Sequence, residues 1–189
     1  MIKDYFVIMA SIIFRPFLPL FLRRLSGVIH VAYIKLGGLS KFVDDLCIQR
    51  DYNLITDVKG FLILYIKGVP FFLGRSYKVS TLQCLNDINC IYHVHQLSHN
   101  QHKDWLFLQD KTYIVTIHDY YCVCERFFLL DYNFNYCHLN EECCKDLDRR
   151  EWISRILLNA SCVIVPDESM IDILSHFYKV DYTVIPHGI

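Results

Sequence analysis

Histidines and an aspartate stand where uncharged, apolar runs of this chain end. His118 and Asp119 directly follow the run Y-I-V-T-I, and His93 and His95 close the run C-I-Y-H-V-H. Imidazole and carboxylate groups orient hydroxyls, move protons or bind metal ions near neutral pH. These residues therefore indicate a ligand site, and His118 and Asp119 are its candidate catalytic pair.

The elements that carry these residues read as buried strands. The run at 113–117 is β-branched and aromatic, as is typical of a parallel strand covered on both faces. In open α/β sheets, ligands bind beyond the carboxyl ends of the strands, where the strand order reverses. A period of two places His93 and His95 on one face of their strand. We therefore expect the histidines to meet at one edge of the sheet.

Strands alternate with helices along the chain, which predicts an α/β fold with a Rossmann-like, doubly wound, mostly parallel sheet. The expected strands are 28–34, 53–56, 61–66, 71–73, 90–95, 113–117, 161–165 and 182–185. The expected helices cover 40–46, 79–85, 99–109 and 149–160, with another that begins at 166–169 after a cap at Asp167 or Ser169. Residues 122–148 lack periodicity and are expected to form a long ordered loop.

Inward-facing residues are expected on two of these helices. Trp105 and Leu106 are expected to face the core from the helix at 99–109, and Trp152, Ile156 and Leu157 from the helix at 149–160.

A pair of glycines follows the first expected strand. Gly37 and Gly38 would let backbone approach a ligand closely, and Ser40 would cap the next helix, whose N-terminus favours a phosphate. An ordinary strand–helix turn is the alternative explanation.

The length, net charge and cysteine count of the chain limit the class of protein. A chain of 189 residues can form one well-buried domain with an appendage, and we expect a helical extension at 1–26 and the α/β domain at 27–189. The net charge of -1 gives no basic surface for nucleic acid. Nine cysteines in a chain of this length fit a reducing, cytoplasmic setting better than a disulfide scaffold.

The N-terminal segment is apolar and basic. An apolar run at 5–14 is followed by Arg15, Pro16 and Pro19, so it is expected to break before the roughly 20 residues that a membrane-spanning helix needs. Two predictions remain for this segment: a helix lying on an anionic membrane surface at the cytoplasmic face, or a helix packed on the domain's own core.

Five segments then form a recognisable series. V-x-x-x-x-L-G-G-L-S-K-F-V-D-D-L, I-Y-H-V-H-Q-L, Y-I-V-T-I-H-D-Y-Y, V-I-V-P-D-E-S and V-I-P-H-G-I follow one another between 28 and 189. Together they resemble the N-terminal domain of glycosyltransferase family 4, which has the GT-B fold. The segment T-I-H-D-Y-Y is similar to members that assemble bacterial surface polysaccharides. Those members have Cys-Pro where this chain has Cys124-Glu125, and P-S where it has Pro166-Asp167.

The resemblance implies retaining, metal-independent transfer from a nucleotide-diphosphate sugar, with no further cofactor. It implies that this domain binds the acceptor, a sugar or lipid-linked sugar, and that a second domain with an E-x(7)-E motif binds the donor. This chain stops at Ile189, where the linker to that domain is expected. The resemblance places His118 beside the reacting sugar. The residues expected to bind substrate are Gly37, Gly38, His93, His95, Tyr120 and Glu168.

Three alternatives remain. A zinc site could use the loop cysteines, although buried thiols that pack the loop fit their spacing better: Cys122, Cys124, Cys137 and Cys143 or Cys144. A metal-dependent hydrolase could use His93, His95, His118 and Asp119 as ligands. A non-catalytic remnant, or one subunit of a split transferase, is the third.

Overall fold

The computed structural model describes most of the chain. The described residues are 2–23, 25–32, 41, 53–76, 82, 85, 88–97, 105–124, 129–130, 133–139 and 147–186. Several expectations lie wholly or mostly outside these residues: Gly37 and Gly38, Ser40, Cys143 and Cys144, and the helices at 40–46 and 79–85.

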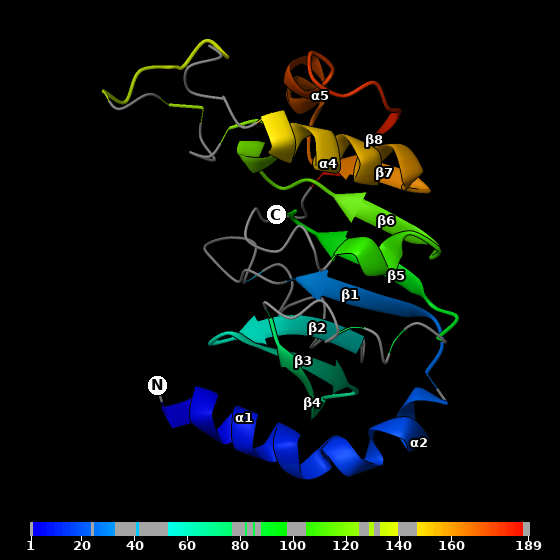
Figure 1. Ribbon diagram of the computed structural model, residues 1–189. Coiled ribbons are helices and arrows are strands. Elements are labelled where there is room, and N and C mark those ends of the chain that lie inside the picture. The colour runs from blue at the N-terminus through cyan, green and yellow to red at the C-terminus, as the bar shows by residue number, and fades with distance from the viewer. Residues whose placement is uncertain are drawn as a thin grey trace.

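The described residues form a mixed α/β structure around one eight-stranded sheet (Figure 1). The strands follow one another across the sheet in the order β4-β3-β2-β1-β5-β6-β7-β8. Their bounds are β1 Val28–Ala32, β2 Asn53–Val58, β3 Phe61–Ile66, β4 Val69–Arg75, β5 Ile91–His95, β6 Tyr113–Thr116, β7 Cys162–Val165 and β8 Tyr182–Val184. This confirms that a strand lies at each predicted place, with β2 longer at its end and β4 longer at both ends; residues 33–34 of the first prediction lie outside the described residues.

The sheet is mostly parallel, as predicted. Strands β2, β1, β5, β6, β7 and β8 run parallel, and β3 and β4 add an antiparallel meander at one side. Lys59 and Gly60 join β2 to β3 with positive φ angles of 53° and 81°. Positive φ at both central residues matches the right-handed twist of a hairpin, which explains the antiparallel pairing there.

The strand order reverses between β1 and β5. From β1 the chain builds outward to β4 on one side, and from β5 it builds outward to β8 on the other. Adjacent strands whose connections leave in opposite directions open a crevice at their carboxyl ends, where α/β proteins bind ligands. The architecture is compatible with a Rossmann-like domain.

Besides a 3₁₀ turn at 105–108, six helical segments accompany these strands in the described residues. They are α1 Ile2–Phe14, the 3₁₀ turn η1 Arg15–Phe17, α2 Leu18–Leu22, the 3₁₀ turn η4 Tyr120–Cys122, α4 Leu147–Asn159 and α5 Glu168–Leu174. Asp167 caps α5 by accepting a hydrogen bond from the Met170 N–H, at 3.2 Å, as one of the two predicted caps. Within the loop expected at 122–148, Leu130 and Tyr136 form an isolated antiparallel bridge.

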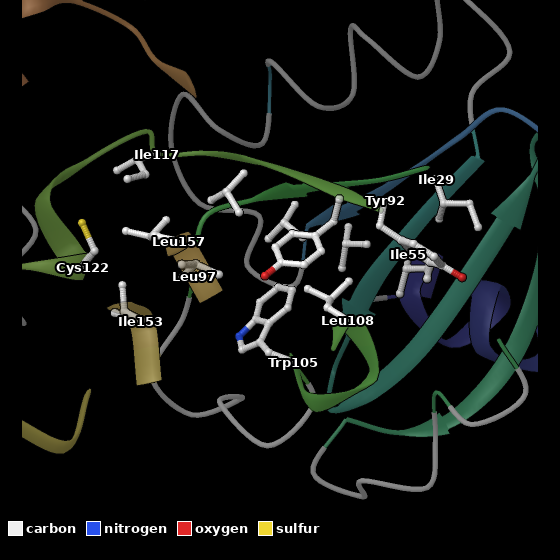
Figure 2. Close-up of a cluster of buried hydrophobic side chains, with 14 of the residues drawn as sticks. Ile29, Ile55, Tyr92, Leu97, Trp105, Leu108, Ile117, Cys122, Ile153 and Leu157 are labelled. Atoms are coloured by element: carbon white, nitrogen blue, oxygen red, sulfur yellow. The ribbon is translucent and has the colours of Figure 1, made fainter. Parts of the chain in front are cut away.

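One face of the sheet carries the hydrophobic core (Figure 2). Ile153 and Leu157 of α4 are buried against it, and Trp152 and Ile156 are partly buried beside them. Trp105 is buried in the same core, as predicted.

The prediction that Leu106 faces inward is wrong: its side chain is 52% exposed. Residues 105–108 form a 3₁₀ turn, in which side chains three apart share a face, so Leu108 is buried with Trp105 while Leu106 points outward.

The N-terminal helix lies along the β4 side of the sheet (Figure 1). The expectation that prolines break it early is wrong. Pro16 and Pro19 each sit in the first turn of a new helical segment, where a missing N–H is tolerated, so the helical path continues to Leu22. The stretch Asp4–Leu22 is long and apolar enough to cross a membrane, by length and composition alone.

Candidate active site

Three histidines from adjacent strands lie side by side on one face of the sheet. The register pairs His30 of β1 with His93 of β5, and the alternation along β5 returns His95 to the same face. Ring centroids are 5.1 Å apart for His30 and His93, 5.1 Å for His30 and His95, and 4.1 Å for His93 and His95. We call these three residues the histidine cluster. It lies across the β1–β5 reversal point.

Contacts between rings extend the cluster to His118. His30 Nδ1 lies 2.8 Å from His95 Nε2, and His95 Nδ1 lies 3.2 Å from His118 Nε2. A neutral imidazole donates from one nitrogen and accepts at the other. If these rings hydrogen-bond as a neutral chain, a change of tautomer in one ring requires a change in its neighbour. His118 is therefore coupled to a ring buried in β1.

Burial keeps two rings of the cluster, those of His30 and His93, uncharged at neutral pH. His30 and His95 are buried, and His93 is half-buried. Burial, and secondarily the neighbouring His93, lower the pKa of His30 to about 4, and burial lowers the pKa of His93 to about 4. Both rings are therefore neutral at pH 7, and each carries one nitrogen lone pair.

A threonine on β6 holds one ring of the cluster. His93 Nε2 lies 2.7 Å from Thr116 Oγ1, and Thr116 is itself buried and paired in register with His95. This contact fixes the orientation of the His93 ring and ties β5 to β6 at their carboxyl ends.

Asp119 is held by a different set of groups. Its Oδ1 accepts hydrogen bonds from Gln96 Nε2 at 2.6 Å and from the Tyr121 N–H at 2.8 Å. Gln96 reaches it from the end of β5, where its backbone has a φ of 66°, a left-handed conformation unusual for a residue other than glycine. Such strain persists where surrounding contacts fix it, and here the Gln96 N–H donates to the Thr116 carbonyl at 3.2 Å.

The pH dependence of stability should report on Asp119. Burial raises the pKa of this carboxyl, and hydrogen bonds from Tyr121 and Gln96 offset that only in part. A carboxyl with a raised pKa binds its proton more tightly in the folded chain than in the unfolded chain. The stability that this proton binding contributes is therefore lost as the pH rises from the pKa of the unfolded chain through the pKa of the folded chain. We expect Asp119→Asn, which keeps an oxygen acceptor, to lose less stability than wild type over that window.

Urea unfolding at a series of acidic to neutral pH values measures this difference. Asp172→Asn, on the exposed side of α5, is the control and should follow the wild-type curve. Parallel curves for wild type and Asp119→Asn would contradict the assigned environment of Asp119.

Tyr120 connects the turn η4 to the start of α5. Burial raises the pKa of its half-buried hydroxyl, against the opposing effect of a hydrogen bond with the Ser169 side chain. Ser169 Oγ in turn donates to Asp167 Oδ1. Glu168 lies exposed in the same turn, with no hydrogen bond to the histidine cluster among the described residues.

Four of the predicted site residues are thus brought to one edge of the sheet: His93, His95, His118 and Asp119. Tyr120 follows them directly, Glu168 is exposed on α5, and Gly37 and Gly38 lie outside the described residues. Sequence reasoning missed His30, Gln96 and Thr116. The signal for His30 was a polar residue inside the otherwise apolar run V-I-H-V-A.

The three loop cysteines that the structure describes behave as packing groups. Cys122, Cys124 and Cys137 are buried free thiols. Burial, and secondarily the charge of Asp119, raise the pKa of Cys122 to about 12, so this thiol is protonated at neutral pH. Within the described part of the chain, the candidate metal-binding group is the histidine cluster, and it contains no cysteine.

The ligand set expected for a metal-dependent hydrolase is not assembled as predicted. Asp119 faces Gln96 and the Tyr121 backbone, whereas the group of converging nitrogens consists of His30, His93 and His95.

No protein-family model, curated protein or solved structure matches this chain.

Proposed function

We propose that this chain is the acceptor-binding domain of a retaining, nucleotide-sugar-dependent glycosyltransferase of the family 4 type. In this proposal the sheet is the doubly wound, N-terminal half of a GT-B fold, and a separate donor-binding domain or subunit completes the enzyme. The product is a polysaccharide or a glycolipid.

The observation that carries the proposal is the position of His118 and Asp119. Both follow the end of β6, after Ile117, at the carboxyl edge of the sheet, near the strand-order reversal between β1 and β5. That edge is where α/β folds bind their ligands. The same two residues are the centre of the T-I-H-D-Y-Y segment that resembles the family.

Each side chain has a role that its surroundings support. His118, held by His95 at 3.2 Å, contacts the acceptor hydroxyl or the reacting sugar. Asp119 orients the segment 119–121 through its bonds to Gln96 and the Tyr121 N–H. Glycosyl transfer is accelerated most by positioning of the acceptor and by hydrogen-bond donors that face the leaving diphosphate. In this proposal the donor-binding domain supplies those hydrogen-bond donors, together with Gly37 and Gly38, which the resemblance places near the diphosphate.

We further propose that the N-terminal helix lies on a membrane that contains a lipid-linked acceptor. Its inner side packs on β4, where the rings of Phe14 and Phe21 lie 6.4 and 4.9 Å from that of Phe71. Its outer side carries an apolar stripe at intervals of three or four residues, made of Phe6, Met9, Ile13, Phe17 and Leu20, all exposed. A helix packed on a sheet along one side suits an interfacial position better than a spanning one.

Vesicle sedimentation tests the proposal in two steps. Wild-type chain should bind anionic vesicles. It should bind them about tenfold more tightly when they carry a lipid-linked saccharide, because the saccharide adds one hydrogen-bonded contact. The double variant Phe6→Asp with Ile13→Asp should bind both kinds of vesicle at least about 100-fold more weakly, because each side chain buried in the membrane contributes about 1.5–3 kcal/mol. His118→Ala should lose only the gain from the saccharide.

Two variants are the controls. Leu158→Asp, at an exposed apolar position on α4, should bind both kinds of vesicle like wild type. His176→Ala, an exposed histidine after α5, should keep the gain from the saccharide. A gain that His118→Ala retains would contradict the acceptor-binding proposal, and equal binding by the double variant would contradict the membrane contact.

A further inference from the structure

The histidine cluster has the spacing of a metal site. One nitrogen from each of His30, His93 and His95 lies within 4.8 Å of the other two. Three imidazoles that bind one tetrahedral ion at about 2.05 Å have their nitrogens roughly 3.4 Å apart. The rings therefore need shifts of about an ångström or less to converge on an ion.

The outward nitrogens of two rings are already engaged. His93 Nε2 contacts Thr116 Oγ1 at 2.7 Å, and His95 Nδ1 contacts His118 Nε2 at 3.2 Å. Histidines that bind metals usually carry such a partner on the nitrogen that does not bind the ion, and it fixes the tautomer and ring orientation. These contacts assign Nδ1 of His93 and Nε2 of His95 as the ligand atoms.

The third ligand comes from the neighbouring strand. His30 Nδ1 and His95 Nε2 face each other at 2.8 Å, so an ion that displaces the proton between them would contact both nitrogens at that position. His30 and His95 are buried on strands held in parallel register, which makes the arrangement rigid. An ion at that position would cross-link β1 to β5 at the strand-order reversal.

The donor set favours one class of ion. Three imidazole nitrogens, without carboxylate or thiolate, do not suit magnesium or calcium, which prefer oxygen ligands. Imidazole suits zinc, copper and nickel, and three histidines with an open fourth position are a recurring zinc arrangement.

We propose that His30, His93 and His95 bind one zinc ion, with the fourth position open. The ion fixes β1 against β5 and, through His95, sets the orientation of His118. This goes beyond the proposed transferase function, which uses no metal in the chemical step.

Zinc binding to the complete 189-residue chain tests the proposal. After removal of metal by a chelator, the chain should bind one zinc ion in competition with a chromophoric chelator. His30→Gln and His93→Gln should each weaken binding by at least about 100-fold, and Thr116→Val, which removes only the partner of His93, by about 10- to 100-fold. His176→Gln, at an exposed histidine, should bind like wild type.

Spectroscopy separates this site from the cysteines. X-ray absorption of the zinc-loaded chain should show nitrogen or oxygen neighbours at about 2.0–2.1 Å and no sulfur at about 2.3 Å. Circular dichroism checks that each variant is folded. If His30→Gln and His93→Gln are unfolded, the zinc affinity of Thr116→Val tests the proposal instead. Sulfur in the zinc shell, no stoichiometric binding, or unchanged affinity in Thr116→Val would overturn the proposal.

Discussion

Leu157→Ala is expected to lower the free energy of unfolding by about 2–5 kcal/mol, whereas Leu158→Ala, one residue further along the same helix, should change it by about 0.5 kcal/mol or less. Leu157 packs in the core on one face of the sheet (Figure 2). Its side chain is 1% exposed, whereas that of Leu158 is 61% exposed. Removing the Leu157 side chain leaves a cavity, and the surrounding residues relax only in part. Removing Leu158 leaves none.

The two variants form a matched pair, because substitution, helix and change in helix propensity are the same. Urea unfolding of both, with equal slopes against denaturant, measures the difference directly. Equal losses of stability would contradict the burial of Ile153 and Leu157 of α4 against the sheet.

The strands were predictable from local sequence. Runs such as C-V-I-V at 162–165 and Y-I-V-T at 113–116 are β-branched or aromatic and uncharged, and such runs are stable only when both faces are covered. Their ends shifted by a residue or two, because pairing with a neighbour, which local sequence does not contain, decides where a strand ends.

Leu106 shows where a helical period misleads. The pattern at 99–109 suggests an α-helix, but the described part is a 3₁₀ turn with three residues per turn. The burial of Trp105 is the same in either helix. The position of Leu106 depends on which helix forms, and sequence periodicity over so few residues does not distinguish the two.

The part of the candidate site that lies on a single strand was predictable from the sequence. Alternation along β5 places His93 and His95 together, and their rings are 4.1 Å apart. His30 joins them only through the β1–β5 register, which brings together residues more than 60 positions apart. Gln96 contacts Asp119 from a left-handed backbone conformation. The residue types around Gln96 do not predict that conformation.

Transfer of sugar to a lipid-linked acceptor tests the central claim most directly. The chain is assayed alone and with a donor-binding domain supplied in cis or in trans, using wild type, His118→Ala and the exposed control His176→Ala. Our account predicts transfer when the donor-binding domain is present, with His118→Ala slower by at least about 100-fold because the acceptor is no longer oriented, and His176→Ala unchanged.

Circular dichroism and the unfolding midpoint establish that His118→Ala is folded, so that a loss of rate reports on the site. Transfer at the wild-type rate by folded His118→Ala would contradict the assignment of the site. Absence of transfer in every pairing, with vesicle binding of His118→Ala equal to that of wild type, would contradict the transferase proposal itself.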